Sequence, residues 1–130
     1  MSELTINDPA NASPITSRFS EPVELVMYAR SISCPFVTLA HRILSEAAVP
    51  YREILIDQDK AAEQRVVTWT GFLSVPTLIA ARPGEDLPLT LPTPLPTGAS
   101  PRGIDRGALI TEPDNDQLRG WLRAVGLLPR

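Results

Sequence analysis

The chain has few features that would stabilise it covalently or attract a polyanion. Cys34 is the single cysteine and His41 the single histidine among 130 residues, which excludes an internal disulfide and disfavours a metal site, since zinc needs about four ligands. Twelve Lys and Arg are outnumbered by 15 Asp and Glu, so nucleic acid is not expected as a partner. No apolar run approaches the roughly 18 residues of a membrane helix, and residues 1–22 resemble no signal peptide. We therefore expect a cytoplasmic protein with no metal and no membrane partner.

Proline is abundant instead, with 14 residues against an average usage of roughly 5 %. Six of the 14 lie in residues 82–106, a segment that reads as an extended, Pro-rich insertion loop. Loops of this length inside compact domains often act as lids or docking segments. Residues 1–22 are polar and predict a flexible tail. The length fits one domain, which we place at residues 23–130.

Hydrophobic patterns in this domain alternate between strand and helix. The run VELVMYA predicts a strand covered on both faces, and the residues after Cys34 have helical periodicity. Asp57 is expected to cap the second helix, and Gly71 and Gly126 to end the second and third helices. The pattern predicts strands at 23–29, 51–56, 75–81 and 107–111, and helices at about 35–48, 58–70 and 113–125. This order predicts a small three-layer α/β domain with a parallel βαβ first half and an antiparallel last strand pair.

The cysteine lies where this pattern places the start of a helix. Pro35 follows it and suits a first helical turn. A helix N-terminus favours the thiolate, the nucleophilic form of cysteine, through its unpaired N–H groups. The other interpretation is a small buried core thiol, which is common for free cysteines. His41, seven residues further on, is too far along the helix to act as the base of Cys34.

Three segments resemble the glutaredoxin family of the thioredoxin fold: MYARSISCPF, VPYREILID and TGFLSVPTL. The resemblance implies a central mixed four-stranded sheet flanked by about three helices, with the Pro-rich insertion before the last strand. It makes Cys34 the matching nucleophile and Pro76 the matching cis-proline. The residues expected to bind substrate or glutathione are Arg30, Pro35, Phe36, Val75, Pro76, Asn115 and Asp116.

The chain departs from the family pattern at several positions. Val37 stands where dithiol members have their second cysteine, which leaves a one-cysteine mechanism, and together with Pro35 it argues against the iron–sulfur branch. Glu63 occupies the position of a Gln or Arg that meets the glutathione carboxylate. Pro113 and Asp114 replace the Gly-Gly turn that precedes the acidic residue.

The sequence thus predicts a one-cysteine thiol–disulfide oxidoreductase that acts on mixed disulfides of glutathione or a related small thiol. The expected partners are the small thiol, as co-substrate, and protein mixed disulfides, with no permanently bound cofactor. The alternative is a catalytically weak thioredoxin-fold interaction module that uses the Pro-rich loop as its contact surface.

Overall fold

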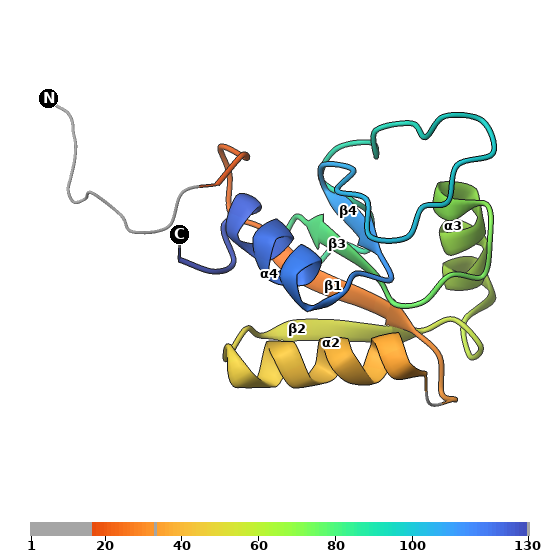
Figure 1. Cartoon of the computed structure of the whole chain (residues 1–130), viewed down its shortest axis with the longest axis horizontal. Coiled ribbons are helices and arrows are strands. Elements are labelled where there is room, and N and C mark those ends of the chain that lie inside the picture. The colour runs from red at the N-terminus through yellow and green to blue at the C-terminus, as the bar shows by residue number, and fades with distance from the viewer. Residues whose placement is uncertain (1–16, 33, 130) are drawn as a thin grey trace, which may run out of the picture.

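The computed structural model describes residues 17–32 and 34–129. Its sheet has four strands in the order β2-β1-β3-β4, and the central strand β1 (Glu24–Ala29) is the apolar run predicted from the sequence. β2 (Tyr51–Leu55) pairs parallel to β1, whereas β3 (Thr77–Ala81) pairs antiparallel to β1 and β4 (Leu109–Thr111) antiparallel to β3. The predicted mixed sheet is confirmed (Figure 1).

Three helices complete the predicted layers. α2 (Pro35–Glu46) and α4 (Asn115–Ala124) contact each other and pack on one face of the sheet, and α3 (Lys60–Thr70) packs on the other. Gly71 ends α3 in the left-handed region at φ 81°, as expected for a helix-terminating glycine. Asp59, and not the predicted Asp57, caps α3: its side chain accepts a hydrogen bond from Ala62 N. The helix begins two residues later than predicted, so the prediction for Asp57 is wrong.

Alternate residues of the strands build two hydrophobic layers, because successive side chains of a strand point to opposite faces. Leu25 and Met27 of β1 join the cluster under α2 and α4, whereas Val26 and Tyr28 join the cluster under α3. All four side chains are fully buried. The run of apolar residues in β1 is unbroken because helices pack on both faces of this strand.

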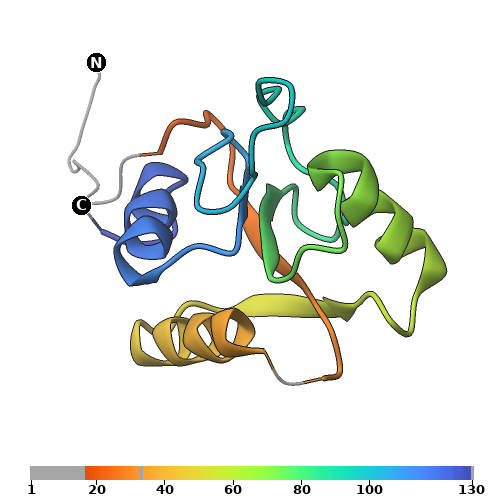
Figure 2. The same cartoon turned by 45° about the vertical axis from the view of Figure 1, so that its right-hand side comes forward.

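Residues 82–106 form no helix or named strand, but they are attached to the rest of the domain. In both views the segment runs between β4 and α3 (Figures 1 and 2). In its second half, buried Arg106 donates hydrogen bonds to Thr93 O at 2.8 Å and to Trp69 O, at the end of α3, at 2.6 Å. Burial lowers the pKa of the Arg106 guanidinium. The insertion is thus fixed to α3 through a buried arginine.

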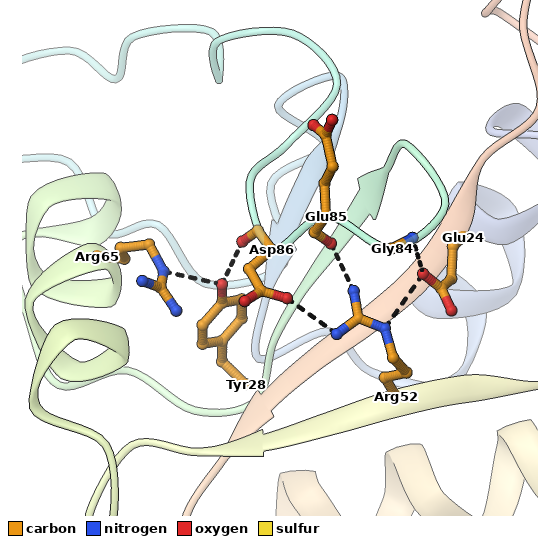
Figure 3. Close-up of polar contacts among 7 residues, drawn as sticks. All are labelled: Glu24, Tyr28, Arg52, Arg65, Gly84, Glu85 and Asp86. Atoms are coloured by element: carbon orange, nitrogen blue, oxygen red, sulfur yellow. Dashed lines mark hydrogen bonds and ion pairs between the residues drawn. The ribbon is translucent and has the colours of Figure 1, made fainter.

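The first half of the insertion is held by Arg52 of β2 (Figure 3). Arg52 donates hydrogen bonds to the Asp86 carboxylate at 2.9 Å and to Glu85 O at 2.5 Å, and its Nε forms an ion pair with Glu24 at 3.1 Å. Glu24 in turn accepts a hydrogen bond from Gly84 N at 2.8 Å. These contacts connect residues 84–86 to the two neighbouring strands β1 and β2.

Tyr28 adds a second contact at the same place (Figure 3). Its hydroxyl donates to Asp86 O and accepts a hydrogen bond from Arg65 Nε of α3 at 3.0 Å. Burial raises the pKa of Tyr28, so the hydroxyl stays protonated as a donor at neutral pH. The predicted tail, residues 1–22, falls mostly outside the described residues, while Arg18 N donates to Ala124 O at the end of α4.

Candidate functional site

Cys34 is the N-cap residue of α2. Its backbone is extended (φ −142°, ψ 136°), its carbonyl accepts the hydrogen bond of Thr38 N at 2.9 Å, and Pro35 is the first helical residue. The side chain is half-buried and makes no capping hydrogen bond. The sulfur therefore stands at the N-terminal end of α2 and is partly open to solvent.

Val75 and Pro76 lie opposite the cysteine, across the gap between α2 and the start of β3. The Val75-Pro76 peptide bond is cis, as the family resemblance implied. Cys34 Sγ is 4.0 Å from Val75 O, a weak sulfur contact. Both residues of the cis bond are buried, so they present a fixed backbone edge beside the sulfur.

A pocket of about 260 Å³ opens at this cysteine. The residues that line it are Arg30, Ile32, Cys34, Leu73, Val75 and Glu112. Arg30, Cys34 and Val75 were predicted from the sequence, and the structure brings these three together. Ile32 and Leu73 are 68 % and 48 % exposed, so the mouth of the pocket is apolar as well as charged.

The loop that carries Arg30 and Ile32 is attached to the segment that follows β2. Ser31 N donates to Asp57 Oδ1 at 3.1 Å, and Gln58 Nε2 donates to Ser31 Oγ at 3.0 Å. Hydrogen bonds from Ser31 lower the pKa of Asp57, with a smaller contribution from the charge of Arg30. Asp57, predicted as a helix cap, instead positions the loop that precedes the cysteine.

Glu112 is the charged pocket residue that sequence reasoning missed, in addition to the apolar Ile32 and Leu73. It follows β4 in a left-handed conformation with φ 46°, and its N–H donates to Pro76 O at 2.8 Å. Its carboxylate pairs with Arg102 Nε at 2.8 Å, and the Arg102 guanidinium lies 5.2 Å from the centre of the Phe36 ring. No local pattern signals this residue, because Glu is not a typical residue for a left-handed turn.

Pro113 and Asp114, which the resemblance places where the family has its Gly-Gly turn, lead directly into α4. Asp114, with φ −79°, is the N-cap of α4 and forms a capping box with Gln117. Glu112, just before them, has a left-handed conformation with φ 46°.

Five predicted binding residues lie outside the lining of the cysteine pocket: the buried Pro76 described above, and four others. Pro35 is exposed on the first turn of α2, and Phe36 is half-buried under Arg102. Asn115 and Asp116 are exposed on the first turn of α4. Among the described residues no group of three His, Cys, Asp or Glu is arranged to hold a metal ion, and no helix is long and apolar enough to span a membrane.

The mixed sheet in the order β2-β1-β3-β4, its helical cover and the cis-proline opposite a helix-capping cysteine define a thioredoxin-like fold of the glutaredoxin type. Residues 25–82, which run from the second residue of β1 past the end of β3 and include Cys34, match the family model Glutaredoxin. This part of the chain is therefore glutaredoxin-like, similar to domains of the thiol–disulfide oxidoreductase type. No curated protein and no solved structure matches it.

Proposed function

We propose that the protein catalyses thiol–disulfide exchange through Cys34 alone, on mixed disulfides of glutathione or a related small thiol. The observation that carries the proposal is the position of the Cys34 sulfur, at a helix N-terminus, 4.0 Å from Val75 O and in an open pocket. Val37 is buried three residues further on, so the reaction proceeds without a second cysteine of this active-site motif.

Two exchange steps complete the proposed cycle. The Cys34 thiolate attacks the glutathione sulfur of a mixed disulfide, a Cys34–glutathione disulfide forms, and the substrate thiolate leaves and takes up a proton. A second glutathione thiolate then attacks the glutathione sulfur of this adduct, glutathione disulfide leaves, and Cys34 is released as thiolate. In total one glutathione thiol is consumed for each mixed disulfide reduced, and it leaves joined to the glutathione of the substrate as glutathione disulfide.

The residues around the sulfur support distinct parts of this cycle. The guanidinium of Arg30 is the cation in the lining of the pocket and suits an anionic thiol ligand. The backbone of Val75, held next to cis-Pro76, offers polar groups to a peptide-like ligand, as the family resemblance implies. We expect Asn115 and Asp116 to contact glutathione only if the ligand extends beyond the pocket onto the first turn of α4.

Intact-mass spectrometry after incubation with glutathione disulfide tests the proposal. The wild-type protein should gain one glutathionyl group, removable by glutathione, and should reduce a glutathione–mercaptoethanol mixed disulfide. Cys34→Ser should lose both properties. Thr38→Ala, an exposed position one turn further along α2, serves as the control and should keep both. Wild-type protein that gains no glutathionyl group, or equal turnover by Cys34→Ser, would show that the proposal is wrong.

A non-catalytic interaction module is the second candidate, because the insertion presents Leu87 and Leu91 with 54 % and 92 % of their surface exposed. Scattered exposed leucines are compatible with an ordinary surface. The two candidates differ in their dependence on sulfur: Cys34→Ser abolishes the exchange reaction and leaves a contact through Leu91 intact.

A further inference from the structure

A second pocket, of about 340 Å³, adjoins the pocket that holds the cysteine. Residues 98–102 of the insertion line it together with Phe72, Ser74 and Glu112. Glu112 lines both pockets, and Leu73, which lines the cysteine pocket, stands between Phe72 and Ser74 in the chain. The two pockets are therefore neighbouring halves of one groove, and the insertion contributes only to the second half.

The insertion is fixed at this groove by contacts on three elements. Arg102 pairs with Glu112 after β4 and lies over the Phe36 ring of α2. Gly103 N donates to Thr111 O of β4 at 2.6 Å, and Arg102 forms an isolated parallel bridge with Thr111. The wall made by residues 98–102 is thus held by the ion pair of Arg102 with Glu112, its contact with Phe36 and the hydrogen bond from Gly103 N to Thr111 O.

The second pocket is chemically suited to an apolar group. Its two charged side chains, Arg102 and Glu112, are paired with each other at 2.8 Å, so the lining carries no net charge. Phe72 is 59 % exposed, and the insertion wall contributes small or uncharged side chains from Gly98 to Pro101. Exposed apolar groups gathered beside polar residues mark binding surfaces more often than scattered ones do.

We propose that this second pocket receives an apolar side chain next to the disulfide-bonded cysteine of a peptide or protein substrate. The proposal rests on the proposed function and names the substrate class of the same site. The glutathione half of the mixed disulfide occupies the cysteine pocket, and the peptide half lies along Phe72. When Cys34 attacks the glutathione sulfur, the peptide cysteine leaves as the thiolate and takes up a proton.

Two glutathionylated peptides of otherwise identical sequence test the proposal. One has phenylalanine and the other serine directly before its single cysteine. The wild-type protein should release the phenylalanine peptide with a kcat/KM roughly five- to tenfold higher, because part of an aromatic side chain is buried. Phe72→Ser should reduce this ratio to below about twofold. Val67→Ser and Leu91→Ser, which remove exposed apolar side chains outside both pockets, should keep the wild-type ratio.

A binding measurement separates this proposal from the proposed function. The same two peptides with serine in place of cysteine cannot exchange disulfides, and their binding is followed through the amide resonances of the non-proline residues among 98–102. Binding that is stronger for the phenylalanine peptide, and weakened by Phe72→Ser, supports the pocket even if no disulfide is exchanged. Equal binding of both peptides, or no binding, overturns it. The proposal also fails if glutathione alone shifts the resonances of residues 98–102 to the same extent.

Discussion

Replacing Glu112 by glycine and, separately, by alanine measures the energetic cost of its backbone conformation. Glu112 lies in the left-handed region at φ 46°, where an L-residue costs roughly 1–2 kcal/mol relative to the right-handed region. Glycine is free of that cost. Both variants lose the ion pair with Arg102, whose side chain is 61 % exposed, so this loss is at most about 1 kcal/mol and is common to the two.

The difference in the free energy of unfolding between the glycine and alanine variants therefore measures the cost of the backbone conformation at position 112. Glycine also gives up more conformational freedom on folding, which offsets roughly 0.5–1 kcal/mol of its advantage. We expect the glycine variant to be more stable than the alanine variant by about 0.5–1 kcal/mol. In a domain of this size the difference corresponds to a melting temperature higher by a few degrees, on the order of 2–5 °C.

Urea unfolding of both variants, analysed with a common m-value, provides the free energies of unfolding. The matched control is Arg42→Gly against Arg42→Ala, at an exposed position inside α2. There alanine should be the more stable residue, by about 1 kcal/mol. If alanine is at least as stable as glycine at position 112 too, the left-handed conformation of Glu112 is not a cost and the reasoning is refuted.

Three further predictions concern contacts away from the cysteine. Tyr28→Phe should lower the free energy of unfolding by about 1 kcal/mol, because it removes the hydrogen bond to Asp86 O, and an unchanged urea midpoint would contradict this. Asp59→Ala should cost about 1 kcal/mol through loss of the α3 cap, visible as a lower melting temperature. The hydrogen bond from Gly84 N is the main cause that lowers the pKa of Glu24 below its ordinary value of 4.5. The ionised Glu24 carboxylate therefore stabilises the folded state above pH 4.5, and this contribution is lost as the pH falls through the lowered pKa. Glu24→Gln should accordingly flatten the acid limb of a stability–pH curve, and two parallel curves would contradict the assignment.

The helices and strands were predictable because their signals are local. The apolar run of β1, the periodicity after Cys34 and the glycine at position 71 each determine an element within about ten residues of chain. The position of Cys34 at a helix start followed from Pro35 and the preceding strand. The cis bond at Pro76 followed from the family resemblance, because a proline that opens a short β-like run can equally start an edge strand.

The remaining features depend on partners that the sequence does not mark. Either Asp57 or Asp59 is a residue type that can cap a helix, and the contacts that distinguish them are not local: Asp57 accepts a hydrogen bond from Ser31, 26 residues earlier, whereas Asp59 accepts one from Ala62 N. The conformation of Glu112 is determined by its hydrogen bond to Pro76 O and its pairing with Arg102. A Pro-rich segment shows no periodicity that would indicate which of its residues face the domain.

The contacts of the insertion also change how an interaction role must be tested. Among the described residues α3 is the helix that covers its face of the sheet, and the insertion is bonded beside it through Arg106 to Trp69 O and through Tyr28 to Asp86 O. Deleting residues 83–101 would remove the acceptors that the insertion gives to Tyr28 and Arg52, so loss of a partner after such a deletion would not distinguish a lost contact surface from a destabilised domain. Because the anchoring residues and the exposed ones are different side chains, single substitutions at exposed positions such as Leu91 separate the two effects. The insertion is thus bonded to β1, β2 and α3, and an interaction role must be tested with those bonds intact.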